Sequence, residues 1–424
     1  MTDSGYLWNF PDEGVDDGPR RFIEMWDRFT FSVPRGISFP THALCLVALT
    51  DNDESDPEPR IEFLALLRRG RISTSLNRTM TLEWFEPIDP LPVEELRQAL
   101  PIRLQRHFSM GKNPRTTWAA ALEALAELRP SIVGSLEKLR TALRPPGWAA
   151  DSEAASTVVY ERDAMWLAAS LAGIERRHLT VRGAPAQPAP FLQGLPEARV
   201  REDAVIEHDA RVFGDWDLIK RHQIGAVEFA NRRGDRLTVI NANRHPIEST
   251  LGVDLLYYTH SYDAFVLVQY KSLRKEDSGK FVYRPRSDSS LAKELARMQS
   301  ARRGRTWTGD LAGYRLDSQP FYFKFCRNVT YEPMSQSMTK GMYLPLDYWD
   351  VLAASSELSG PRGGIVVSYD TVPRYLTNDA FVELVEDGWI GSRYGDSDEI
   401  SVIVRASLDD GHSLLLATHT PYDH

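Results

Sequence analysis

Cysteine is nearly absent from this sequence, whose 424 residues include only Cys45 and Cys326. Two cysteines so far apart cannot form a zinc knuckle or a disulfide framework, and they fit a reducing compartment. The chain also lacks an apolar run near the roughly 20 residues that span a bilayer. Its acidic, proline-containing start does not have the basic and then apolar form of a signal peptide. We therefore expect a soluble, cytoplasmic protein that makes no membrane contact.

Basic residues are fewer than acidic residues, and the formal net charge is -9. This excludes a protein that coats nucleic acid by charge alone, so any nucleic-acid contact must use a local basic patch. The chain is 42% hydrophobic and 10% aromatic, which is ordinary globular composition. Its length is sufficient for two or three domains, each with its own core.

The pattern of apolar residues divides the chain into three parts. Strand-like runs at 43–49, 61–67 and 80–85 precede helical periodicity at 92–107, 116–143 and 162–174, which predicts an α+β domain. A Pro- and Ala-rich segment at 183–190 is the best linker. We predict an N-terminal α+β recognition or regulatory domain at 1–190, an α/β unit at 191–330 and a C-terminal α+β extension at 331–424. Whether the extension continues the sheet before it stays open.

The second and third parts have a simple predicted order of elements. Two hairpins, at 226–241 and 246–271, precede a helix at 289–301 and a strand at 321–326. Strands at 365–369, 400–405 and 413–418 and a helix at 379–386 follow.

The hairpin at 246–271 carries the candidate site. Its two runs of β-branched and aromatic residues flank a short polar break, which favours antiparallel pairing. Alternation along a strand places Gln269 and Lys271 on one face. A buried lysine needs a partner, and the candidates are Asp254 on the neighbouring strand and Glu248 six residues before it. Such a cluster predicts a divalent-metal site.

An acid before a Gly-x-Asp strand, a turn and an apolar strand ending in Gln-x-Lys resemble the active-site hairpin of the restriction-endonuclease-like PD-(D/E)XK nucleases. The matching positions are Glu248, Asp254, Gln269 and Lys271. The resemblance implies a mixed sheet flanked by helices, Mg²⁺ or Mn²⁺ held by Glu248, Asp254 and Gln269, and a Lys271 that orients or activates the attacking water. Val253 stands where proline is usual, and Gln269 replaces the usual Glu or Asp, which lowers the negative charge.

The chemistry accounts for these residue types. Phosphodiester hydrolysis places charge on the nonbridging and leaving oxygens, which Mg²⁺ stabilises while it lowers the pKa of a bound water. The alternative interpretation is that Gln269 and Lys271 are ordinary strand-end residues. Lys324 also lies in an apolar strand, but no Gly-x-Asp precedes it.

The helix after this hairpin and the segment following it supply the predicted nucleic-acid contacts, in which arginine binds phosphate and tryptophan stacks on bases. These residues are Arg297, Arg302, Arg303, Arg305 and Trp307. A solvated helix end is the alternative.

We therefore expect a metal-dependent nuclease acting on DNA rather than RNA, in bacterial defence, such as antiviral defence, or in DNA processing. A protein partner or a homo-oligomer is left open. The alternative function is a catalytically inactive, nuclease-like nucleic-acid-binding or assembly protein, in which Gln269 marks the loss of metal binding.

Overall fold

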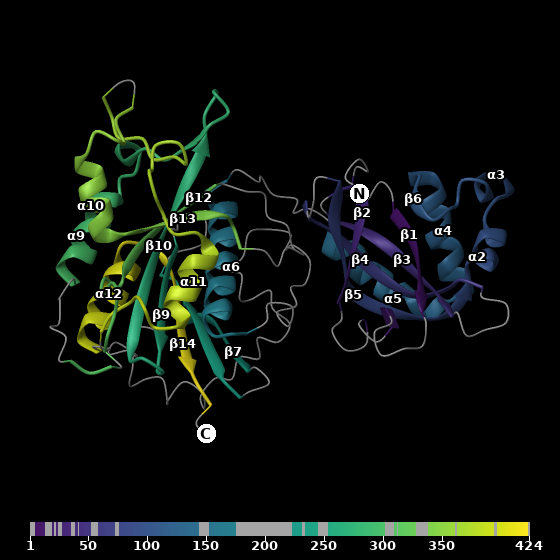
Figure 1. The fold of residues 1–424 in the computed structure, drawn as a ribbon, viewed down its shortest axis with the longest axis horizontal. Helices are drawn as coiled ribbons and strands as arrows, with labels where there is room; N and C mark the ends of the chain where they lie inside the picture. The colour runs from purple at the N-terminus through teal and green to yellow at the C-terminus, as the bar shows by residue number, and fades with distance from the viewer. Residues whose placement is uncertain are drawn as a thin grey trace. The chain divides into compact units, whose positions relative to one another are not determined.

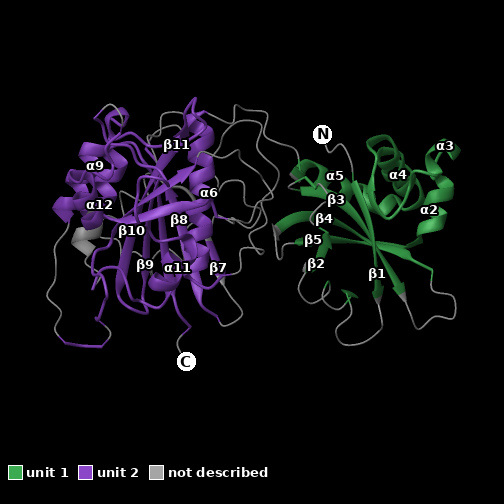
Figure 2. Cartoon of the chain, turned by 45° about the horizontal axis from the view of Figure 1, so that its top comes forward, with its two compact units in different colours: residues 1–145 green, residues 146–424 purple. Residues whose placement is uncertain are grey.

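The chain forms two compact units, residues 1–145 and residues 146–424 (Figure 2). The computed structural model describes residues 5–12, 19–20, 23, 28–34, 39–40, 42–51, 58–72, 76–143, 152–174, 223–230, 234–244, 253–301, 309–311, 313–327, 338–360, 363–393 and 397–422. The predicted linker at 183–190 lies outside these residues.

Unit 1 is an α+β unit built on a mixed six-stranded sheet with the order β2-β5-β4-β3-β1-β6. β1 and β3 pair in parallel, and the other neighbours are antiparallel. The strands are β1 (Gly5–Asp12), β2 (Arg28–Pro34), β3 (His42–Asp51), β4 (Arg60–Ile72), β5 (Asn77–Pro92) and β6 (Gly111–Asn113). The helices are α2 (Val93–Ala99), α3 (Ile102–Gln105), α4 (Arg115–Leu128), η1 (Pro130–Ile132) and α5 (Val133–Leu143).

The sheet of unit 1 is curled, as its aromatic contacts show. The Phe10 ring of β1 lies 4.8 Å from the Phe29 ring and 5.1 Å from the Phe31 ring of β2, measured between centroids. β5, β4 and β3 separate these two strands in the sheet. The sheet must therefore bend enough to bring β1 and β2 together over a shared apolar core.

Unit 2 is built on a mixed eight-stranded sheet whose main order is β13-β12-β10-β9-β14-β8-β7, with β11 paired to the end of β10. β10 is parallel to β12, and β9 is parallel to β14. The strands are β7 (Gln223–Ala230), β8 (Arg236–Ala242), β9 (Val253–Thr259), β10 (Ala264–Lys275), β11 (Phe281–Val282), β12 (Phe321–Arg327), β13 (Gly341–Pro345) and β14 (Ser413–Thr420).

Helices cover both faces of this sheet (Figure 1). On one face, α6 (Glu153–Leu171) and α11 (Asn378–Glu386) pack on Leu255, Val268 and Tyr322. On the other, α9 (Leu291–Ala301), α10 (Leu346–Ala354) and α12 (Ser397–Asp409) pack on Leu256 and Phe323. Coverage on both faces explains why these strands are almost continuously apolar.

The boundary between the units differs from the prediction of an N-terminal domain at 1–190. It lies after Pro145, and α6 belongs to unit 2. Ser152 caps α6 by accepting a hydrogen bond from the Ala155 amide at 3.1 Å. The helix is buried on nearly all sides, and Trp166 and other residues of it form part of the core beneath β9 and β10.

Two further predictions concern the C-terminal part. Residues 331–424 are continuous with the unit before them, because β13 and β14 are strands of the same sheet. The strand predicted at 400–405 is wrong: these residues lie in α12. Ile403, Val404 and Leu408 are buried at helical spacing while Val402 is 53% exposed. Within the described residues, no helix combines the length and apolar character needed to cross a bilayer.

Candidate active site

The β9–β10 hairpin carries the predicted site residues. Its strands pair antiparallel, with Ala264 opposite Thr259 and Gln269 opposite Asp254. In the turn, Asp263 has a φ of 46° and accepts a hydrogen bond from Tyr258 Oη at 2.6 Å. Aspartate tolerates this left-handed conformation because its short side chain bonds locally. The predicted hairpin and its polar turn are therefore present.

Asp254, Gln269 and Lys271 converge on the face of the sheet that α9 and α12 cover. Alternation places Asp254 on the side of Leu256, and Gln269 and Lys271 on the side of Leu267. Asp254 and Gln269 are fully buried, and Lys271 is 5% exposed. Burial makes a charged side chain costly unless it is paired, so these groups require partners.

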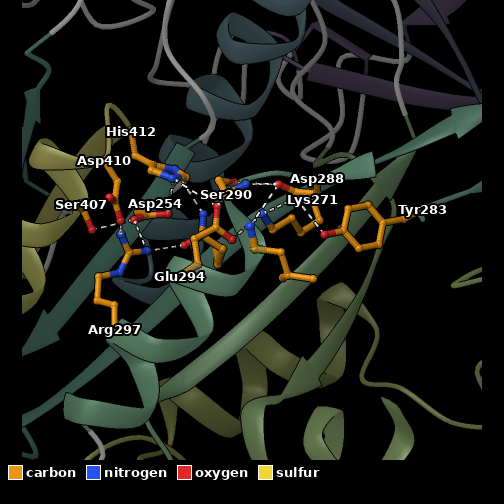
Figure 3. A network of polar contacts seen from close by, with 12 residues as sticks. Asp254, Lys271, Tyr283, Asp288, Ser290, Glu294, Arg297, Ser407, Asp410 and His412 are labelled. Atoms are coloured by element: carbon orange, nitrogen blue, oxygen red, sulfur yellow. Dashed lines mark hydrogen bonds and ion pairs between the residues drawn. The ribbon is translucent and has the colours of Figure 1, made fainter. Parts of the chain in front are cut away.

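Arg297 of α9 is the partner of Asp254 and Gln269. Its Nη2 donates to Gln269 Oε1 at 2.7 Å and to Asp254 Oδ2 at 3.1 Å. Its Nη1 lies 3.5 Å from Asp410 Oδ2. Ser407 Oγ of α12 also donates to Asp254 Oδ2, at 2.7 Å (Figure 3). One guanidinium therefore bridges the carboxylate and the amide that face each other across the two strands.

Lys271 is held by two carboxylates. Its Nζ donates to Asp288 Oδ2 at 2.7 Å and forms an ion pair with Glu294 (Figure 3). Asp288 also accepts from Tyr283 Oη at 2.8 Å and from the amides of Ser290 and Leu291 at 3.0 and 3.2 Å. Asp288 thereby binds amides at the start of α9 and joins the lysine to that helix.

His412, just before β14, lies between the acids of this cluster. Its Nε2 is 3.2 Å from Glu294 Oε1, and its Nδ1 is 3.3 Å from Gln269 Nε2 and 3.7 Å from Asp254 Oδ1. The Nδ1 contact fits a ring nitrogen that accepts from the Gln269 amide. His412 therefore joins the Asp254 half of the cluster to the Lys271 half.

The two acids around Lys271 are held ionised. Burial raises the pKa of Glu294, but the close approach of His412 and the charge of Lys271 outweigh it and bring the pKa to about 2. Burial also raises the pKa of Asp288, and the Lys271 charge and hydrogen bond outweigh it, so this pKa lies below its ordinary value.

The remaining predicted residues divide into two groups. Glu248 and four of the predicted nucleic-acid contacts lie outside the described residues; these four are Arg302, Arg303, Arg305 and Trp307. Arg297, the fifth, is buried against Asp254 and Gln269 and is not at the surface. It points inward because it lies three residues after Glu294 on the stripe of α9 that also includes Leu291 and Met298.

Glu294 and His412 were not among the predicted site residues. A signal for Glu294 exists in the sequence, since it falls at helical spacing within the apolar face of α9 with Leu291 and Met298. No local pattern points to His412. It lies 143 residues from Gln269, and only the position of β14 beside β9 brings the two together.

Arg297 lies against the two oxygens, of Asp254 and Gln269, that were predicted to hold a divalent metal. No three His, Cys, Asp or Glu side chains among the described residues form a ready metal site. Asp254 and Gln269 nevertheless offer the hard oxygen ligands that Mg²⁺ and Mn²⁺ prefer. Asp254 Oδ1 is also buried without a hydrogen-bond partner among the described residues. These oxygens would hold an ion only if the guanidinium moved.

A second buried charge pair lies on the opposite face of the sheet. Lys324 of β12 is fully buried and forms an ion pair with Asp163 of α6. Its Nζ lies 5.0 Å from the Tyr343 ring and 5.3 Å from the Tyr270 ring, measured to the centroids. Asp163 also accepts from the Thr339 amide. The pair joins α6 to the sheet and makes no contact with the Asp254 cluster.

Comparisons of the chain with protein-family models, with curated proteins and with solved structures found no match.

Proposed function

We propose that this protein is a metal-dependent nuclease that hydrolyses phosphodiester bonds, with its site at Asp254, Gln269 and Lys271. The observation that carries the proposal is the convergence of these three side chains on one face of an antiparallel hairpin. The surrounding elements support a restriction-endonuclease-like core. After β10 the chain passes through α9 and returns as the parallel strand β12, within a mixed sheet covered by helices on both faces.

Each residue has a role in this chemistry. Asp254 and Gln269 would hold Mg²⁺ or Mn²⁺ through a carboxylate and an amide oxygen, with Glu248 as a further acid. The ion supplies charge stabilisation of the phosphate and a water of lowered pKa. The Lys271 ammonium, fixed by Asp288 and Glu294, donates to the water or to a phosphate oxygen.

The proposed substrate is DNA. The net charge of -9 gives no general attraction to a polyanion, so binding would use the arginines at 302–305 that follow α9. Bacterial defence or DNA processing is the proposed setting, on analogy alone.

A catalytically inactive, nuclease-like binding or assembly protein is the second candidate. It is favoured by Arg297, which already neutralises Asp254 and satisfies Gln269. A protein of this type would bind DNA in a salt-dependent manner and leave it intact with Mg²⁺ or Mn²⁺.

The test is cleavage of plasmid DNA by the wild type, Asp254→Asn and Lys271→Met, at fixed salt and varied Mn²⁺. We expect each substitution to slow cleavage by about 100-fold or more, because Asp254→Asn removes the carboxylate that would hold the ion and Lys271→Met removes the ammonium that acts on the water or the phosphate. Asp163→Asn is the matched control, since it alters a buried acid–lysine pair on the other face. Full activity of Asp254→Asn, or equal losses in Asp163→Asn, would refute the assignment.

A further inference from the structure

We infer that Arg297 is a built-in counterion that a divalent cation must displace, so that the guanidinium and the metal bind the same oxygens in alternation. This inference rests on the proposed function, because it takes the oxygens of Asp254 and Gln269 to be metal ligands. It adds a closed state to that site, in which the Arg297 guanidinium binds the oxygens of Asp254 and Gln269 in place of a metal.

The first support is the geometry of one nitrogen. Arg297 Nη2 contacts Asp254 Oδ2 and Gln269 Oε1 at 3.1 and 2.7 Å, and these residues are direct partners across β9 and β10. A divalent cation held by the same two oxygens would need the space between them. It would occupy the space of Nη2, and the positive charges would repel each other. The two cations are therefore mutually exclusive.

The second support is how few of its nitrogens the guanidinium uses in hydrogen bonds. Arg297 Nε has no hydrogen-bond partner among the described residues, and Nη1 has only the 3.5 Å contact to Asp410. A guanidinium carries five N–H donors, and those of Nε and Nη1 are not used in a hydrogen bond with the described residues. Because Asp410 is 21% exposed in its side chain, it offers Nη1 an acceptor toward solvent. Arg297 can shift toward Asp410 without losing every acidic partner.

The third support is the charge balance of the cluster. Its described carboxylates outnumber its permanent cations: Asp254, Asp288, Glu294 and Asp410 surround Lys271 and Arg297. Asp254 Oδ1 is also buried without a hydrogen-bond partner among the described residues. The cluster therefore has more carboxylates than permanent cations and an unused ligand atom, which favour the exchange of Arg297 for a cation of higher charge.

Thermal unfolding with Mn²⁺ alone tests the exchange. Arg297→Gln leaves Asp254 buried without a counterion, so it should melt below the wild type. Added Mn²⁺ should then raise its melting temperature by about 5 °C or more, and that of the wild type by much less. Mn²⁺ affinity, measured from the free-ion electron paramagnetic resonance signal, should be at least about tenfold higher in Arg297→Gln. Adding Asp254→Asn to this variant should abolish the gain.

Arg315→Gln is the matched control. Arg315 is a buried arginine of the same unit that donates to the carbonyls of Tyr314 and Tyr262. Its loss should lower the melting temperature without any recovery in Mn²⁺. Arg297→Lys keeps the competing charge and should bind Mn²⁺ as weakly as the wild type.

Equal Mn²⁺ affinity in the wild type and Arg297→Gln would overturn the inference, as would an Arg297→Gln protein that fails to fold even with Mn²⁺. The proposed function fails separately. If Arg297→Gln binds Mn²⁺ tightly and no variant cleaves DNA, the exchange stands and the nuclease does not. If the wild type cleaves DNA and Arg297→Gln shows no gain in Mn²⁺ affinity, the nuclease proposal stands and the exchange of Arg297 for a metal does not.

Discussion

Lys271 and Lys324 show how the face to which a strand residue points decides its partners. They lie on neighbouring strands of one sheet, and both are almost completely buried. Lys271 meets acids at the start of α9, whereas Lys324 meets Asp163 and two tyrosine rings. Burial lowers the pKa of Lys324, but the Asp163 charge outweighs it and raises the pKa above its ordinary value. Lys324 is therefore a charged, structural lysine.

Lys324→Met should destabilise unit 2 by about 3–5 kcal/mol, because it leaves Asp163 buried without its counterion. The double variant Asp163→Asn/Lys324→Met should lose less, since no unpaired charge remains. Urea unfolding followed by tryptophan fluorescence measures both. A double variant less stable than Lys324→Met would contradict this account.

At the residue scale, alternation alone was sufficient to predict that Gln269 and Lys271 share a face. The pairing of Gln269 with Asp254 follows from the register of a short hairpin, which depends on residues close together in the sequence. The contact of Arg297 was not predictable in this way. The sequence shows that Arg297 lies on the apolar face of α9. Which buried group that face contacts depends on how the helix packs on the sheet.

Among the elements, β14 is an interior strand of the unit 2 sheet. It lies between β9 and β8, parallel to the first and antiparallel to the second. Leu415 faces the core beneath α6, and Leu416 faces the core beneath α9 and α12. His412 immediately precedes it. The strand therefore supports both cores and the candidate site.

Leu415→Ala and Leu416→Ala should each destabilise unit 2 by about 2–5 kcal/mol, because each leaves a cavity in a closely packed core. Val402→Ala on α12 should cost less than about 0.5 kcal/mol, since Val402 is 53% exposed. Denaturant melts compare the three variants. Similar losses for Val402→Ala and Leu415→Ala would show that β14 is not central to the fold.

The elements also show which structural features the sequence patterns predict and which they do not. The pairings of β7 with β8 and of β9 with β10 were predictable because the two strands of each pair lie close together in the sequence. α12 was mistaken for a strand because Ile403 and Val404 also match a short apolar run. α6 was assigned to the wrong part of the chain, because a helix apolar on all sides does not indicate which core receives it.

At the scale of the whole molecule, each unit has its own core. The stability of each unit should therefore depend on pH through its own buried titratable groups. In unit 1, burial and the charge of Arg68 lower the pKa of His42 from 6.5 to about 4. The unfolded chain binds more protons between these values, so stability is complete above pH 6.5 and falls as the pH drops toward 4.

The loss of stability should be on the order of 1–3 kcal/mol for unit 1. His42→Gln removes the titrating group and should flatten this dependence. Thermal melts of the wild type and the variant at pH 7 and pH 4.5 provide the comparison. Parallel decreases in the two proteins would show that other groups cause the acid sensitivity.

The place of β14 in the sheet also governs when the sheet of unit 2 can close during synthesis. Residues 413–420 leave the ribosome after every other described strand and helix, yet they fill the gap between β8 and β9. Until they emerge, the β7–β8 hairpin has no strand that joins it to the rest of the sheet, and Gln269 lacks His412. A nascent chain therefore cannot assemble the buried cluster, and any activity of that cluster begins only after translation has passed residue 420.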